Sequence, residues 1–162
     1  MELLILAILT LVLGIAVRTD TLTQRIPNAL TGTAACAGLL IETTQSGVPG
    51  LLASLAGIAV GAGFMLPFYA LRGMGAGDVK LMGAIGAFLG PKAVLLAAAV
   101  TLVIGALFGL GRVAAHYVSR ARKPLLPELE VQAATLASVR KEKFPYAVAI
   151  ACGTLITLIV VK

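Results

Sequence analysis

Two isolated aspartates stand at the edges of apolar runs and are of the residue type that can do acid–base chemistry. Asp20 follows the first run in "VRTDTLTQRIPN", and Asp78 opens a later one in "GMGAGDVKL". A carboxylate beside a hydrophobic segment costs free energy unless it has a partner or a function. If the two met, they would share one proton, because like charges a few ångströms apart cannot both ionise cheaply. Such a pair can activate a water molecule with one carboxyl and protonate a peptide's oxygen or nitrogen with the other.

The segments around the two acids contain residues that shape turns. Glycines at 73, 75 and 77 precede Asp78, and a backbone without side chains would let a substrate backbone come close. After Asp20, Pro27 suits the first turn of a helix, and Asn28 adds a polar side chain near that start. Both segments therefore combine a carboxylate with an adjacent chain turn.

A plainer interpretation of the same acids is surface ion pairing. Asp20 would pair with Arg18 or Arg25, and Asp78 with Lys80. Exposed pairs of this kind are common and contribute little to stability. Spacing does not show whether residues 58 positions apart meet in space, so the residues alone leave both interpretations open.

The composition is that of a protein dissolved in lipid. The chain of 162 residues is 59% hydrophobic and 12% charged, with a mean hydropathy of +1.02. A soluble domain carries roughly 25% charged residues and cannot hide so much apolar surface at this size. The net charge of +6 therefore indicates which loops face the cytoplasm, rather than binding to nucleic acid.

Six apolar runs predict an all-α, polytopic membrane protein with about six transmembrane helices. They cover residues 2–18, 27–42, 50–71, 78–90, 93–112 and 144–161. A helix needs about 20 residues to cross the hydrocarbon core, so the fourth run is short. We interpret residues 1–162 as one membrane-embedded domain with a basic cytoplasmic loop at about 112–143. Within it, "PELEVQAATLASVRK" is predicted to form a short surface helix.

The distribution of basic residues predicts that the N-terminus lies outside. Six alternating spans then leave only Lys92 and Lys162 of the 13 Lys and Arg on the outer side, as the positive-inside rule requires. Both aspartates fall on the cytoplasmic side. The first run is preceded by no base, so we expect a retained helix rather than a cleaved signal peptide.

The cysteines and the histidine give no metal-binding pattern. Cys36 and Cys152 sit inside apolar runs without any CxxC spacing, and His116 has no second ligand at a suitable spacing. We expect no metal and no cofactor.

The two acid-bearing segments resemble the type IV prepilin peptidase family, aspartic proteases of the GxGD kind. The matches are Asp20 followed by "RIPN" at 25–28, and "GAGDVKL" at 75–81. A weaker similarity is "KFPYAVAIACG" at 143–153, which is like the family's last span. Together with the six-run layout, the resemblance extends over essentially the whole chain.

The resemblance implies an endopeptidase of the prokaryotic cytoplasmic membrane that removes the basic leader from type IV or Flp prepilins and pilin-like proteins at the cytoplasmic face. Its partners would be prepilin or pseudopilin substrates and membrane lipid, and not nucleic acid. The implied catalytic pair is Asp20 and Asp78. The matching positions with site-shaping roles are Gly75, Gly77, Lys80, Arg25, Pro27 and Asn28.

This chain departs from the larger members of that family. Those members carry an extra cytoplasmic domain with paired cysteines that bind zinc, and they also methylate the new N-terminus. Because no CxxC occurs here, we expect no N-methyltransferase domain and a short form resembling the Flp, or tight-adherence, peptidases.

Two other classes of function are compatible with the residues. One is a non-catalytic membrane scaffold of a pilus or secretion machine, which would tolerate Asp→Asn at both positions. The other is a small proton-coupled transporter that uses the two acids as a relay, although such proteins usually show internal repeats and none is apparent here.

Overall fold

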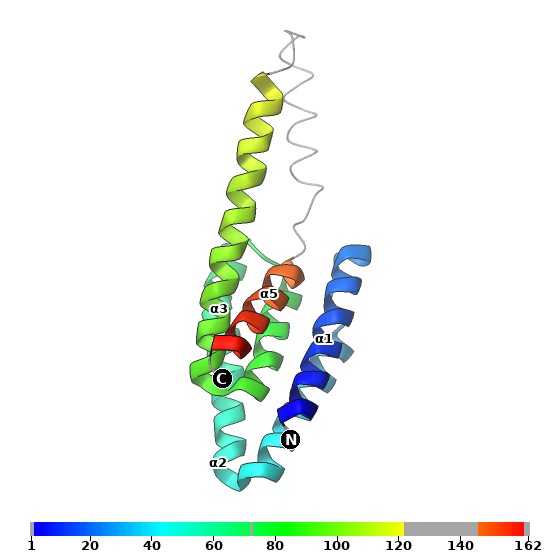
Figure 1. The fold of residues 1–162 in the computed structure, drawn as a ribbon, viewed down its shortest axis with the longest axis vertical. Helices are drawn as coiled ribbons and strands as arrows, with labels where there is room; N and C mark the ends of the chain where they lie inside the picture. Colours follow the sequence, from blue (N-terminus) through cyan, green and yellow to red (C-terminus); the bar gives the residue numbers. More distant parts are fainter. Residues whose placement is uncertain (1, 72, 122–145, 161–162) are drawn as a thin grey trace. The chain divides into compact units, whose positions relative to one another are not determined.

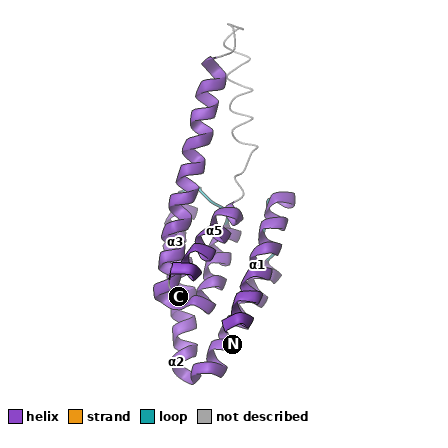
Figure 2. Cartoon of the chain, in the orientation of Figure 1, coloured by secondary structure: helices purple, strands orange, loops and turns teal. Residues whose placement is uncertain are grey.

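A computed structural model of the chain describes residues 2–71, 73–121 and 146–160. Within these residues every regular element is an α-helix, as Figure 2 shows. The helices are α1 (Glu2–Thr23), α2 (Asn28–Ala70), α3 (Ala76–Ala121) and α5 (Tyr146–Val160). The predicted all-α class is confirmed.

Three of the helices are long and apolar enough to cross a membrane. The qualifying stretches are Leu3–Thr23, Asn28–Ala70 and Ala76–Gly111, and α5 is a shorter apolar helix. The chain divides into two compact units, residues 1–104 with 145–162 and residues 105–144. In the described residues α2 and α3 each cover two of the predicted runs, and the number of crossings and the outward N-terminus stay predictions.

One glycine inside α2 and one inside α3 account for the difference between runs and helices. Gly47 (φ 64°) and Gly90 (φ 71°) adopt a left-handed conformation that interrupts each helix. Residues on both sides of Gly47 approach the same part of α3: a Cβ added at Gly38 would meet Ala87, and one at Gly57 would meet the Gly86 carbonyl. α2 therefore folds back on itself at Gly47, as the ribbon in Figure 1 shows.

α3 folds back in the same way at Gly90. A Cβ added at Gly61 would lie 2.7 Å from the Met82 carbonyl oxygen and 2.9 Å from a methyl group of Val94, which lie on opposite sides of the bend. A straight α-helix of 46 residues would be about 70 Å long, more than twice the hydrocarbon thickness of a bilayer. Because the chain turns back at Gly90, each half of α3 is shorter than this length.

Small residues lie inside this helical unit, and many large apolar side chains point outward. Gly57 and Gly86 sit backbone against backbone, and the buried Ser54 hydroxyl donates to the Ala87 carbonyl at 2.8 Å. By contrast, Leu3 is 82% exposed and Leu52 is 61% exposed. This distribution is typical of helices that associate in lipid, where close backbone approach replaces the hydrophobic effect.

Two helix ends lie further along the chain than the apolar runs predict. α1 continues past residue 18 to Thr23, so Asp20 lies in its last turn and not in a loop. Threonine hydroxyls support this polar turn by donating back to the helix, for example Thr21 to Val17 at 2.9 Å. The helix ends where Gln24 takes a positive φ of 52°.

α3 likewise continues to Ala121, so the first part of the predicted loop 112–143 is helical. No glycine or proline interrupts the chain between Arg112 and Pro124, which removes the usual signals for a helix end. The rest of that loop, including its predicted surface helix, lies outside the described residues.

Candidate active site

Asp78 is held by the turn that begins its own helix. Gly75 immediately precedes α3 and occupies the N-cap position, which makes Asp78 the third helical residue. The Gly75 N–H donates to Asp78 Oδ2 at 3.0 Å, and the Asp78 N–H donates to the Gly75 carbonyl at 3.1 Å. The first of these bonds is the half of a capping box that the third helical residue supplies, and the second is a backbone turn bond, because Gly75 has no side chain to accept the Asp78 N–H. The carboxyl is thereby held by a residue only three positions away, and Asp78 is 7% exposed.

Asp20 is held by a residue far along the chain. Its Oδ2 accepts a hydrogen bond of 3.2 Å from the N–H of Ala147, 127 residues later. Ala147 lies in the first turn of α5, whose N–H groups have no acceptor within their own helix. The carboxyl of Asp20 therefore caps α5, and α1 packs against that helix. It is 9% exposed.

The tertiary structure brings the two acids together. Asp20 and Asp78 lie within electrostatic range of each other, and Tyr146 at the start of α5 lies within range of Asp78. Backbone N–H groups, rather than Lys or Arg side chains, are the hydrogen-bond partners of both carboxyls among the described residues. The surface ion pairs considered above do not form there.

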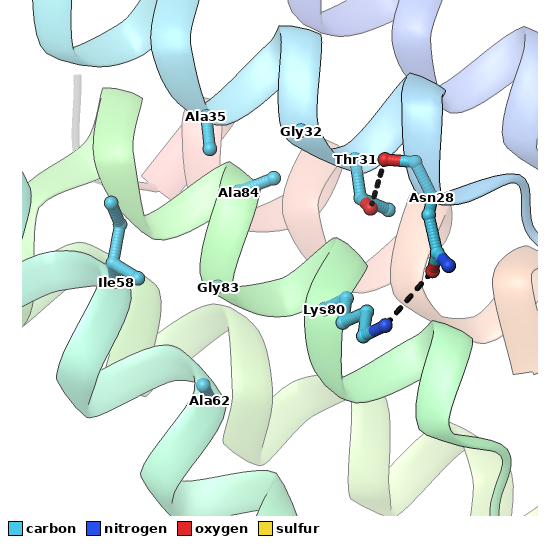
Figure 3. Close-up of a pocket in the computed structure, with 9 residues that line it drawn as sticks. All are labelled: Asn28, Thr31, Gly32, Ala35, Ile58, Ala62, Lys80, Gly83 and Ala84. Carbon is cyan, nitrogen blue, oxygen red and sulfur yellow. Dashed lines mark hydrogen bonds between the residues drawn. The ribbon is translucent and has the colours of Figure 1, made fainter.

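Two contacts join the segments that carry the acids. A Cβ added at Gly77 would lie 3.0 Å from Cβ of Ile26, so the absence of a side chain at Gly77 lets the connection after α1 pack on this turn. The Lys80 ammonium donates to Asn28 Oδ1 at 2.9 Å, which links the starts of α3 and α2 (Figure 3). Gly77, Lys80 and Asn28 thus belong to one structural junction.

The remaining predicted site residues have separate positions. Pro27 is the N-cap residue of α2, with φ −61° and ψ 134°, and its carbonyl accepts the N–H of Leu30 at 3.1 Å. Arg25 is exposed, and its carbonyl accepts the Thr23 hydroxyl at 3.1 Å. A Cβ added at Gly75 would lie 3.2 Å from Asp78 Oδ2, so this glycine leaves room for the carboxyl itself.

Sequence reasoning did not single out the start of α5 as part of the site. Ala147 contributes a backbone N–H, which any residue except proline carries, so its side chain gives no signal. The available signal was positional, because the segment "KFPYAVAIACG" places Pro145 and an aromatic residue at the head of an apolar run. The described residues contain no group of three His, Cys, Asp or Glu that could hold a metal ion.

The model of the type IV leader peptidase family matches residues 7–110 of the chain. This chain belongs to that family. The matched range includes Asp20, the segment at 25–28 and the segment at 75–81, and it ends before α5. No curated protein and no solved structure matches the chain. Membership of the leader peptidase family implies cleavage of leader peptides from prepilins, and it accords with the long apolar helices of a membrane protein.

Proposed function

We propose that the chain is a membrane aspartic endopeptidase in which Asp20 and Asp78 form the catalytic pair. The observation that carries this proposal is the convergence of two nearly buried carboxyls, each supported by a backbone N–H at a helix N-terminus. Among the described residues neither carboxyl forms an ion pair with Lys or Arg, so both are available to a substrate.

The chemistry follows from one shared proton. The ionised carboxyl takes a proton from a water molecule while the water oxygen attacks the carbonyl carbon of the scissile peptide bond. The protonated carboxyl gives its proton to the carbonyl oxygen, which forms a neutral tetrahedral diol. Collapse of the diol breaks the C–N bond, and the carboxyl that received the water's proton passes it to the leaving nitrogen. The other carboxylate takes the proton of one diol hydroxyl, whose oxygen becomes the carbonyl oxygen of the product acid. The pair then holds one proton again, ready for the next cycle.

The substrate class follows from the family. A prepilin has a short basic leader before an apolar helix, so it lies in the membrane with its leader on the cytoplasmic side. We place the catalytic pair at that same face, with an outward N-terminus and about six crossings produced by the bends at Gly47 and Gly90. The product keeps an unmethylated N-terminus, as expected of the short, Flp-type form.

Topology is tested by labelling single cysteines from outside, in a background that lacks the exposed Cys36 and Cys152. A cysteine at position 47 should react with a membrane-impermeant maleimide, and one at position 75 should not. Labelling at position 75 from outside would reverse the proposed orientation.

Catalysis is tested with a prepilin reconstituted together with the purified protein. Asp20→Asn and Asp78→Asn should each reduce cleavage by at least about a thousandfold, and the double variant should be no slower than the slower single, because paired groups act as a unit. Glu42→Gln is the matched control, since it neutralises an acid in the lining of a cavity to which neither Asp20 nor Asp78 contributes. Normal cleavage by either aspartate variant would instead favour a scaffold.

A further inference from the structure

An open cavity of about 360 Å³ lies beside the start of α3 and is not used by the acids. Asn28 and Lys80 stand at its polar end, as the close-up in Figure 3 shows. The rest of the lining consists of Thr31, Gly32, Ala35, Ile58, Ala62, Gly83 and Ala84. The cavity therefore joins one positive charge to a mostly apolar lining.

The cavity faces away from the candidate active site. Asp78 and Lys80 are two positions apart on one α-helix, which separates their side chains by about 200° around the helix axis. Asp20 is held by α5, whereas the cavity is built from α2 and α3. Neither acid lines this cavity, so a molecule bound there does not occupy the candidate active site.

The apolar part of the cavity has room for a hydrocarbon chain. Gly32 lines it, and a Cβ added there would meet no atom within 4 Å. The opposite wall is tighter, since a Cβ added at Gly83 would lie 3.4 Å from Cβ of Ala62. Open space on one side and packed helices on the other suit a flexible chain that enters from the surrounding membrane.

The Lys80 ammonium lies at the polar end of the cavity and has hydrogen-bond donors to spare for a ligand. Lys80 is exposed, and among the described residues its ammonium donates one hydrogen bond, to Asn28 Oδ1 at 2.9 Å. An ammonium carries three protons, so two donors remain for an anion. No acidic side chain lines the cavity. A second cavity of similar size, about 390 Å³, is lined by both Lys92 and Glu42, and so it does not share this excess positive charge.

We propose that this cavity binds one anionic phospholipid, with the headgroup phosphate on Lys80 and part of an acyl chain along Gly32 and Ala62. The charge selects an anion, and the apolar walls select an attached hydrocarbon chain, which a free phosphate lacks. A basic residue near anionic lipid contributes about a fivefold preference. This binding is independent of the peptidase activity proposed above.

The test uses the full chain, purified in detergent and analysed by native mass spectrometry with added phosphatidylglycerol or phosphatidylcholine of identical acyl chains. Unmodified protein should retain one phosphatidylglycerol about fivefold more strongly than phosphatidylcholine. Lys80→Met should remove that preference, whereas Lys80→Arg and the control Lys92→Met should keep it. Inorganic phosphate should not displace the retained lipid.

A second pair of variants tests the hydrocarbon part without changing any charge. Gly32→Leu should fill the open space and reduce retention of both lipids at least threefold. Gly14→Leu is the matched control, because a Cβ there also meets no atom and Gly14 does not line the cavity. Unchanged retention in Gly32→Leu, an unchanged headgroup preference in Lys80→Met, or displacement of the lipid by a prepilin peptide would each overturn the proposal.

Discussion

The two carboxyls of the candidate site are held in opposite ways. Asp78 is supported within three residues by the turn that starts α3, and that turn needs no other part of the chain. Asp20 is supported across 127 residues by the first turn of α5. In both places the donor is an N–H that its own helix leaves without an acceptor. The same physical solution thus arises once from local sequence and once from tertiary packing.

The hydrogen bonds that hold Asp78 and Asp20 depend on different parts of the fold. The turn around Asp78 forms whenever α3 begins at Ala76, so it is as robust as that helix. The support of Asp20 exists only while α5 remains docked. Gly153 fixes that docking, because its missing side chain lets α5 approach Thr101 and the Ala97 carbonyl closely. We therefore expect the geometry of Asp20 to be the more easily disturbed of the two.

Among changes to the supports of the two acids, the largest effect should come from removing the long-range donor. Ala147→Pro deletes the N–H that Asp20 accepts, and proline is tolerated in a first helical turn. Loss of a hydrogen bond to a charged group costs about 1.5 to 3 kcal/mol, so kcat/KM for prepilin cleavage should fall about 10- to 100-fold. Val148→Pro keeps the Ala147 N–H and serves as the control. Equal turnover in the two proline variants would show that the support of Asp20 is dispensable.

A smaller loss is expected where the two acid-bearing segments touch. Gly77→Val should press on Ile26 and displace the connection that follows α1, because the added Cβ lies 3.0 Å from that side chain. Overpacking of this kind costs about 1 to 3 kcal/mol, and kcat/KM should fall about tenfold. Gly109→Val is the control, since a Cβ at Gly109 meets no atom within 4 Å. If both variants cleave prepilin alike, the contact does not position the acids.

The smallest effect is expected at the exposed link between α2 and α3. Asn28→Ala removes the acceptor of the Lys80 ammonium, and because this link is exposed to solvent, it contributes about 1 kcal/mol or less, as exposed charged pairs do. Turnover measured with the same prepilin should change less than threefold, and Asn28→Asp should restore it by returning an acceptor oxygen. A tenfold loss in Asn28→Ala would place the link among the main supports of the site.

The membrane class, the all-α fold and the turn at Asp78 could be predicted from the sequence. Apolar composition dictates lipid as the solvent, and helices satisfy backbone polar groups there. The breaks near Gly47 and Gly90 were also predictable, since each glycine stands close to a proline. Their consequence, that the chain turns back on itself at each glycine, was not, because the direction of the chain after such a break depends on how the two halves pack. The end of α1 was missed because threonine hydroxyls sustain a polar turn that hydropathy assigns to a loop.

The partner of Asp20 was decided only by tertiary structure. Ala147 acts through its backbone N–H, and nothing in the identity of an alanine indicates which carboxylate that group will meet. The proximity of Asp20 to Asp78 and the contact between Ile26 and Gly77 likewise depend on how separate helices pack. Hydrogen bonds between neighbouring residues can be predicted from the local sequence, because their donor and acceptor are a few residues apart. Contacts between helices that are distant in the sequence cannot be predicted in this way, because the chain between them can take many paths.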